Sequence, residues 1–112
     1  MEDCAFCRIV AKQIPSDIVY EDPDVVAFAD ANPVAPFHVL VVPKAHIPNL
    51  ASVANDPLGG KLLAACAIVA RDGGYTERGY RVVANTGRDA GQTVIHLHLH
   101  VIAGRQLAWP PG

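Results

Sequence analysis

Hydrophobic residues form short runs along this chain, and most of these runs have the composition of β-strands. Each is rich in branched or aromatic residues and is bounded by turn-forming residues. The predicted strands cover residues 17–21, 25–29, 37–42, 80–85 and 95–102. The first two are separated by Asp22-Pro23-Asp24, whose chemistry favours a tight turn, so we expect them to form a hairpin.

Two further segments have the pattern of helices. In the longer one, apolar side chains recur at helical spacing, at Leu58, Leu62, Leu63, Cys66 and Val69. Asp56 followed by Pro57 is typical of a helix N-cap and first helical position, which predicts a helix to about Arg71. Asp3 can cap a shorter helix over residues 4–12. Together these elements predict an α+β fold, with a five-stranded, largely antiparallel meander sheet and the long helix on one face.

Length and composition narrow the class of protein. The 112 residues predict one domain, 1–112, because a second would normally need roughly another 100 residues. A hydrophobic content of 51% supplies a packed core and argues against intrinsic disorder. No apolar run approaches the ~18 residues of a membrane-spanning helix, and the acidic start is unlike a secretory signal, so we expect a cytoplasmic protein without membrane contact. A net charge of −2 is too balanced for nucleic-acid binding through phosphate neutralisation.

Three of the five histidines alternate with apolar residues in the last predicted strand. His96, His98 and His100 should therefore share one face, while Ile95, Leu97, Leu99 and Val101 pack on the other. Alternate strand residues are about 6.6 Å apart, so two imidazoles can share a metal more readily than three. A run of histidines that only pack or face solvent is the simplest alternative. Upstream, Gly87 and Gly91-Gln92-Thr93 offer flexible backbone and a hydroxyl, as a phosphate-binding loop requires.

The three cysteines, an odd number, suit free thiols or metal ligands better than a disulfide framework. Cys4 and Cys7 are three residues apart on the first predicted helix, so their sulfur atoms face one side and could share a metal. Two reduced thiols without a metal are the alternative, and a redox role is less well supported. Cys66 lies in the apolar run of the long helix, where we expect a buried thiol without function.

The segment 91–102 closely resembles the histidine-triad (HIT) signature, in which three histidines alternate with apolar residues. Other segments are similar to the Hint branch, the nucleotide-binding phosphoramidases: Phe28-Ala29-Asp30 with Asn32-Pro33, Val41-Val42-Pro43-Lys44, residues 80–83 with Asn85, and the tail 104–112. The resemblance covers nearly the whole chain. It implies a HIT-like fold that forms a homodimer with one continuous sheet, in which the C-terminal arm 104–112 approaches the partner's active site.

The resemblance implies a hydrolase that cleaves purine nucleoside phosphoramidates, of AMP or GMP, through a nucleotidyl-histidine intermediate. A neutral imidazole is a competent nucleophile near pH 7, and the middle position favours His98. His100 and His38 would donate hydrogen bonds to the phosphate oxygens. Thr93 would bind the phosphate or the leaving group, at a position where the family more often has serine. The alternatives are a dinucleoside polyphosphate hydrolase, a nucleotidyl transferase and a catalytically silent nucleotide-binding module.

The same resemblance assigns nucleotide-binding residues. Asp30 would accept hydrogen bonds from both ribose hydroxyls, a task that suits a carboxylate. The base would lie between apolar walls formed by Phe6, Ile9, Phe28 and Leu40, although each of these also suits core packing. The phosphate would be surrounded by Asn85 and by the loop residues Gly91, Gln92 and Thr93, together with His98 and His100. Trp109 would border the leaving group across the dimer interface. Ala31 is smaller than the branched residue usual in this pocket, which leaves the base preference open.

For the cysteine pair, the resemblance is to bacterial-type Hint proteins. These pair the two cysteines with a histidine after the Val-Pro-Lys strand, here His46, and with the first triad histidine, here His96. Two thiolates and two imidazoles make a closed tetrahedral zinc site, in which no position is left for catalysis. We therefore expect a structural Zn²⁺ held by Cys4, Cys7, His46 and His96, and a reaction that needs no cofactor.

Overall fold

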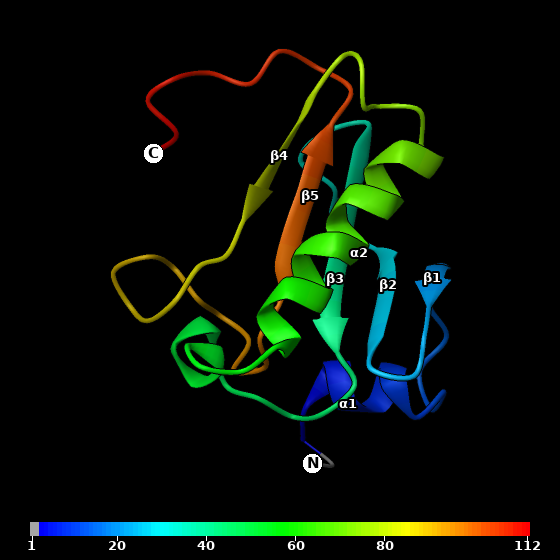
Figure 1. Cartoon of the computed structure of the whole chain (residues 1–112), viewed down its shortest axis with the longest axis vertical. Helices are drawn as coiled ribbons and strands as arrows, with labels where there is room; N and C mark the ends of the chain where they lie inside the picture. Colours follow the sequence, from blue (N-terminus) through cyan, green and yellow to red (C-terminus); the bar gives the residue numbers. More distant parts are fainter. Residues whose placement is uncertain (1–2) are drawn as a thin grey trace.

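The computed structural model describes residues 3–112, so the first two residues of the predicted domain lie outside it. A single sheet contains all five strands: β1 (Ile18–Glu21), β2 (Val25–Ala29), β3 (Phe37–Pro43), β4 (Tyr80–Val83) and β5 (Leu99–Ala103). The helices are α1 (Ala5–Val10), α2 (Leu58–Asp72) and a 3-10 turn, η1 (Leu50–Val53), which the sequence pattern did not predict. Every neighbouring pair of strands is antiparallel, which confirms the α+β fold (Figure 1).

The strand order, β1-β2-β3-β5-β4, differs from a simple meander. The first three strands follow the chain, but the connection after β3 carries α2 across one face of the sheet before the chain returns as β4 (Figure 1). β4 therefore lies at the far edge, and β5 fills the position between β3 and β4. No helix in the described part of the chain is long and apolar enough to cross a membrane.

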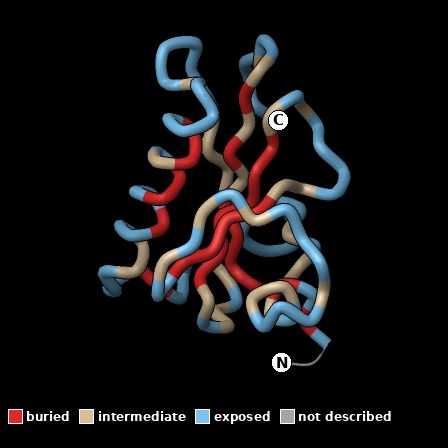
Figure 2. The backbone as a smooth tube through the Cα atoms, turned by 90° about the vertical axis from the view of Figure 1, so that its right-hand side faces the viewer, coloured by how far each residue is buried: buried red, intermediate tan, exposed pale blue. Residues whose placement is uncertain are grey.

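Alternate side chains of the central strands serve opposite faces of the sheet. On the face covered by α2, Val25, Val39 and Val101 pack in one apolar cluster with Leu62 and Val69 of the helix. On the other face, a smaller cluster contains Cys4, Phe6, Val26, Phe28, Leu40 and Val42. The buried positions of the strands and of the inner side of α2 meet in the centre of the molecule, as Figure 2 shows. The alternating directions of the side chains along each strand thus build two layers.

Several element boundaries differ from prediction. The cap of α1 is Cys4 and not Asp3, because the Cys4 sulfur accepts a hydrogen bond from the Cys7 amide at 3.4 Å. The helix ends at Val10, earlier than expected. The N-cap of α2 is Pro57 and not Asp56 as predicted, and the regular helix begins at Leu58, although the Asp56 carboxylate still accepts a hydrogen bond from the Leu58 amide at 2.8 Å.

The largest difference between a predicted and an observed boundary is at the start of the last strand. β5 begins at Leu99, so His96 and His98 precede it and only His100 of the three lies within it. Pro43 has no amide hydrogen to continue the ladder, and the Leu97 amide instead donates to the Ile47 carbonyl at 2.6 Å. Ile95 was predicted to pack in the core, but its side chain is 58% exposed. β4 likewise ends at Val83, before the predicted limit of residue 85.

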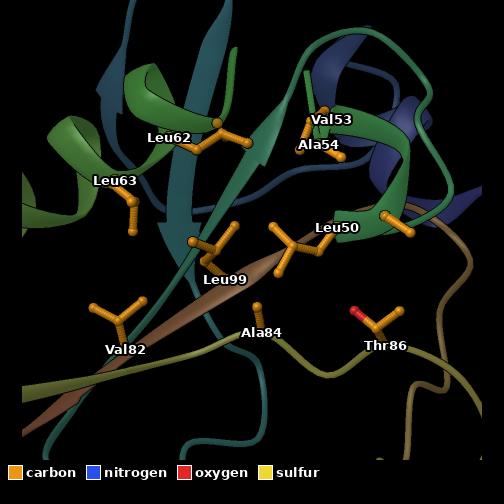
Figure 3. A pocket seen from close by; sticks show the side chains of 11 residues that line it. Leu50, Val53, Ala54, Leu62, Leu63, Val82, Ala84, Thr86 and Leu99 are labelled. Atoms are coloured by element: carbon orange, nitrogen blue, oxygen red, sulfur yellow. The ribbon is translucent and has the colours of Figure 1, made fainter. Parts of the chain in front are cut away.

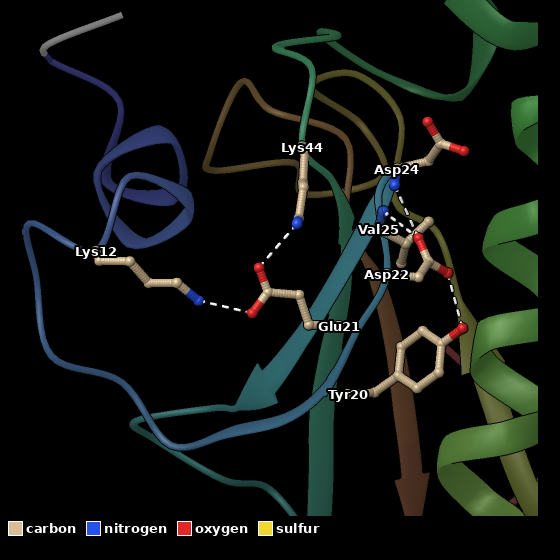
Figure 4. A network of polar contacts seen from close by, with 7 residues as sticks. All are labelled: Lys12, Tyr20, Glu21, Asp22, Asp24, Val25 and Lys44. Atoms are coloured by element: carbon tan, nitrogen blue, oxygen red, sulfur yellow. Dashed lines mark hydrogen bonds and ion pairs between the residues drawn. The ribbon is translucent and has the colours of Figure 1, made fainter.

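A polar network secures the hairpin and the end of α1 (Figure 4). Glu21 on β1 binds Lys12 at 2.7 Å and Lys44 at 2.8 Å, and these two hydrogen bonds lower the pKa of its carboxyl. Asp22 accepts hydrogen bonds from the amides of Asp24 and Val25, each at 2.8 Å, which confirms the predicted turn. The segment after α1 is thereby held against the sheet.

Candidate functional site

A cavity of about 590 Å³ lies on the face of the sheet opposite α2. Its lining includes these predicted residues: Phe6, Ile9, Phe28, Leu40, Asp30, Thr93, His98 and His100. Apolar side chains from α1, β2 and β3 form one part, and the polar groups lie at the end of β2 and beside β5. Residues from six separate segments therefore meet in one cavity with an apolar wall and a polar wall.

His98 is held by hydrogen bonding and by aromatic contacts. Its Nδ1 lies 2.8 Å from the His96 carbonyl oxygen, and since a carbonyl only accepts, Nδ1 carries the hydrogen. Nε2 of the neutral ring is then the nitrogen with the lone pair. The ring lies edge-on to Phe6 and to His100, with centroids 5.1 Å apart in both cases. The fold thus presents one defined tautomer of a largely buried imidazole at the cavity.

His38 and His100 form a hydrogen-bonded chain beside it. The Val34 amide donates to His38 Nδ1 at 3.1 Å, so the neutral ring carries its hydrogen on Nε2 and donates it to His100 Nδ1 at 2.9 Å. Nε2 of His100 is left as a hydrogen donor. Burial, followed by the charges of His98 and His38, lowers the pKa of His100, which favours the neutral ring at pH 7.

Asp30 lies next to this pair of hydrogen-bonded histidines, at the end of the cavity where the ribose is predicted to bind. Its Oδ2 lies 3.4 Å from His38 Nε2, and its Oδ1 accepts a hydrogen bond from the Asn32 amide at 2.8 Å. Asp30, His38 and His100 are close enough to suggest a metal group. However, His38 Nε2 carries a hydrogen as long as Nδ1 accepts from Val34, so it has no lone pair for a metal. The cluster fits hydrogen bonding better than metal binding.

A second cluster brings together the four predicted metal ligands. Cys7 Sγ lies 3.1 Å from His46 Nδ1, and His96 Nδ1 lies 3.4 Å from Cys4 Sγ. All four ligand atoms lie within 4.8 Å of one another. His96 Nε2 donates to the Pro43 carbonyl at 2.9 Å, so the lone pair of Nδ1 faces the sulfur atoms. The donor set and the tautomer fit a tetrahedral zinc ion, and the residues form a group able to hold a metal.

Binding of such an ion would change the charge state of the Cys4 and Cys7 thiols. Burial, followed by the neighbouring Cys4, raises the pKa of the Cys7 thiol, because two thiolates repel each other in a site of low polarity. A bound dication has the opposite effect and stabilises the thiolates. All three cysteines carry free thiols, and burial raises the pKa of Cys66 to about 11, in keeping with the predicted buried thiol.

Some predicted residues lie outside the cavity lining. Gln92 uses its side chain to brace the loop: its Oε1 accepts from the Gly87 amide at 3.0 Å, and its Nε2 donates to the Pro48 carbonyl at 2.7 Å. Asn85 and Gly91 also do not line the cavity of this chain. Sequence reasoning missed a part of the wall formed by Ile14, Pro15, Ser16 and Asp17, whose only signal was the proline that follows the first helix.

Trp109 is 82% exposed and lies outside the lining of this cavity. The arm that carries it is held to its own sheet through Arg81, whose Nη2 donates to the Ala108 carbonyl at 2.9 Å. The indole therefore projects from the molecule with its apolar surface in solvent.

The chain is similar to known proteins over almost its whole length. The family model of the HIT domain matches residues 11–107. An uncharacterized HIT-like protein of Synechococcus elongatus is 51% identical over 113 residues, which cover 99% of this chain and 98% of that protein. The solved structure of a HIT family hydrolase from Legionella pneumophila Philadelphia 1 has a TM-score of 0.94 and 42% identity, covering 98% of this chain and 100% of that one. For a histidine triad protein from Clostridium difficile the values are 0.92 and 43%, with 96% of each chain covered. The chain therefore belongs to the HIT family.

Proposed function

We propose that this protein is a nucleotidyl hydrolase that cleaves purine nucleoside phosphoramidates through a covalent intermediate on His98. The observation that carries the proposal is the 2.8 Å hydrogen bond from His98 Nδ1 to the His96 carbonyl. It leaves a neutral nucleophilic Nε2 at a cavity with both an apolar and a polar wall. The name of the similar Legionella protein, a hydrolase, supports the reaction class.

The cavity walls suit the three parts of a nucleotide. Phe6, Ile9, Phe28 and Leu40 form an apolar wall of the size and polarity that a purine needs. Asp30 supplies two carboxylate oxygens for the ribose hydroxyls. His100 and the Thr93 hydroxyl are donors for the phosphate oxygens, and Asn85 with the Gly91–Thr93 loop would complete the phosphate shell once the nucleotide is bound.

The reaction divides one difficult displacement into two steps. His98 Nε2 attacks the α-phosphorus, and the bond from phosphorus to the amine nitrogen breaks as the amine takes up a proton from solvent. His100 Nε2, kept as a donor by His38, stabilises the charge on the phosphate oxygens in the transition state. Water then attacks the same phosphorus and gives one proton to solvent, and the bond from phosphorus to His98 Nε2 breaks, which releases the nucleoside monophosphate and restores neutral His98.

The test is turnover of an adenosine phosphoramidate by the wild type and by His98→Ala. Loss of this nucleophile should lower kcat by about a thousandfold or more, a barrier increase of ~4 kcal/mol. AMP affinity and thermal stability should be retained, and rapid quenching should trap labelled nucleotidyl-protein only in the wild type. Arg71→Ala, on the exposed side of α2, is the control. An undiminished rate in His98→Ala would overturn the assignment of the nucleophile.

The same assay separates the alternative functions. Faster turnover of a dinucleoside polyphosphate than of any phosphoramidate would identify the protein as a polyphosphate hydrolase with the same nucleophile. Transfer of the nucleotidyl group to an acceptor other than water would identify a transferase. Tight binding of a mononucleotide without turnover and without a trapped intermediate would identify a nucleotide-binding module.

We also propose that Cys4, Cys7, His46 and His96 hold a structural zinc ion. The tautomer of His96, set by the Pro43 carbonyl, supports this assignment because it leaves the ligand nitrogen unprotonated. Metal analysis should find about one zinc per chain in the wild type. The double variant Cys4→Ser/Cys7→Ser should contain none. Protein supplied with zinc, with both thiols reduced and still free of metal, would contradict the proposal.

Our proposal for the oligomeric state is a two-fold homodimer that joins two copies at β4. β4 is an edge strand, paired only with β5, and its outer backbone groups are available to a second copy. Beside it lies an apolar groove of about 740 Å³ between η1, the start of α2 and β4 (Figure 3). Leu50 and Leu63 at this groove are 44% and 58% exposed, so pairing of two edges would also cover them. A dimer could bring the exposed Trp109 of one copy to the site of the other.

Sedimentation tests the dimer. The wild type should have the mass of a dimer at micromolar concentration, and Leu63→Lys should shift it toward the monomer. Deletion of Leu107–Gly112 should preserve the dimer and change leaving-group preference more than nucleotide affinity. A monomeric wild type would refute the proposed interface.

A further inference from the structure

The root of the C-terminal arm contacts the loop between β2 and β3, residues 30–36. Arg105 Nε donates to the Val34 carbonyl at 3.0 Å, and Nη1 donates to the Gln106 carbonyl at 3.0 Å. The planar guanidinium is thus held at two points, which fixes its orientation more firmly than a single bond would. An arginine that follows β5 in sequence therefore anchors a loop that is 71 residues away along the chain.

The anchored residue, Val34, is the one that orients His38. Its carbonyl accepts from Arg105, while its amide donates to His38 Nδ1 at 3.1 Å. His38 Nε2 then donates to His100 Nδ1 at 2.9 Å. Four groups therefore form one continuous series, from the guanidinium at the surface through a single loop residue to two buried or half-buried imidazoles.

Gly104 adds an independent contact with the same loop. Its φ is +97°, a left-handed conformation that side chains disfavour. A Cβ atom at this position would lie 3.0 Å from the Cβ of Pro36. The backbone of the arm root thus packs directly against the loop, and the rings of Pro33 and Pro36 limit the conformations that the loop can adopt. Both contacts restrain the position of the Val34 amide.

We propose that Arg105 is a positioning residue: it holds Val34 so that the Val34 amide keeps His38 in its Nε2–H form, and His38 in turn keeps His100 as a hydrogen donor toward the phosphate. Without the amide at Nδ1, His38 can exchange to the Nδ1–H form. In that form Nε2 can no longer donate to His100, and the hydrogen of His100 is free to move to Nδ1. The catalytic consequence rests on the proposed function, whereas the tautomer of His38 does not.

The direct test is long-range 1H–15N correlation spectroscopy of the imidazole rings. In the wild type His38 should show one tautomer, with hydrogen on Nε2 and an accepting Nδ1. Arg105→Ala should give a mixture of tautomers or exchange broadening at His38 and His100, and Arg105→Lys, which retains one donor, should restore the wild-type pattern in part. Arg71→Ala is the control for loss of an exposed arginine. A truncation after Gln106 should leave His38 unchanged, because Arg105 and its two acceptors remain.

The kinetic test uses the same variants. Arg105→Ala should lower kcat for the phosphoramidate by about five- to tenfold, with KM and AMP affinity within about twofold of the wild type. A purely structural role would lower thermal stability without this separation of kcat from KM. The inference is overturned if Arg105→Ala retains a single His38 tautomer. If the wild type turns over no phosphoramidate, the proposed function fails, and the tautomer measurement still decides the role of Arg105.

Discussion

The two faces of the sheet use the same strands for different purposes. On one face α2, fifteen residues long, covers the apolar side chains, and Leu62, Val25 and Val101 are fully buried. On the other face α1 has six residues and covers only one end, so Phe6 and Phe28 pack beside a cavity that contains His98. The length of the covering helix thus decides whether a face becomes core or site.

The comparison shows how a small protein separates stability from chemistry. The cluster under α2 consists of buried apolar side chains and the thiol of Cys66. The opposite face buries His96, His98 and His38, and each of these rings makes a hydrogen bond within the described residues. Buried imidazoles are tolerated there because carbonyl and amide groups satisfy them. We therefore expect substitutions on the two faces to separate stability from ligand binding.

The largest effect should come from removing the proposed zinc ion from the face of the sheet opposite α2, here called the histidine face. Zinc at a thousand times its Kd stabilises the folded state by ~4 kcal/mol, because it binds only the assembled ligands. Thermal unfolding of the wild type should therefore shift strongly when a chelator is added. The response should vanish in Cys4→Ser/Cys7→Ser. Identical unfolding with and without chelator would mean that this face is stable without an ion.

On the α2 face, Leu62→Ala should destabilise the protein by ~3 kcal/mol, because Leu62 is fully buried and its loss leaves a cavity. Denaturant unfolding measures this change. Nucleotide affinity of the folded protein should be unaltered, since the two faces share only the backbone of the sheet. Arg71→Ala on the same helix should change stability by no more than ~0.5 kcal/mol. A large loss of affinity in Leu62→Ala would show that the faces are coupled.

Phe28→Leu should lower AMP affinity and cost little stability, which is the reverse of the effect expected for Leu62→Ala. The side chain is 3% exposed and lies edge-on to Phe6 with ring centroids 5.5 Å apart, so the smaller residue should cost ~1 kcal/mol of stability. AMP affinity should fall by about five- to tenfold because an aromatic wall of the cavity is lost. Titration calorimetry measures the affinity. Val41→Ala, a core residue of the other face on the adjacent strand, should lose stability but keep its affinity.

Acid should lower the stability of the folded protein through His100, which lies on the histidine face. Its pKa is lowered in the folded protein, by burial first and then by the charges of His98 and His38, with Asp30 opposing them. Below its ordinary pKa of 6.5 the unfolded chain binds a proton that the folded protein does not, so stability falls as pH decreases from there toward the folded pKa. This one group contributes a slope of at most ~1.4 kcal/mol per pH unit. His100→Gln should flatten the profile below pH ~6.5, and an unchanged slope would contradict the assignment.

The smallest effect should follow Glu21→Gln, which weakens the ion pairs with Lys12 and Lys44 near the end of α1. All three side chains are partly or largely exposed, so we expect a loss of ~0.5 kcal/mol or less. High salt should reduce the difference between the variant and the wild type further. AMP affinity should not change. A loss of stability comparable with that of Leu62→Ala would show that the network holds the whole of α1 in place. A small loss is expected if it holds only the residues that follow the helix.

The sequence by itself predicted the five strands and the two α-helices, and it identified the residues that we propose carry the chemistry. Branched and apolar residues favour an extended backbone, so the runs 25–29 and 37–42 predicted strands, and the α+β fold is confirmed. The spacing of Cys4 and Cys7 and the three alternating histidines also marked the site before any contact was known.

Only the tertiary structure decided which of these residues meet and in what chemical form. The order of the last two strands depends on where α2 returns the chain, and the end of the ladder at Pro43 leaves His96 and His98 before β5. The hydrogens on His96 and His100 are assigned by groups far away in sequence, the Pro43 carbonyl and the His38 ring. Periodicity reports the direction of a side chain relative to its own backbone. The hydrogen-bond partners of His96 and His100 are set by packing between distant segments, and no local pattern contains them.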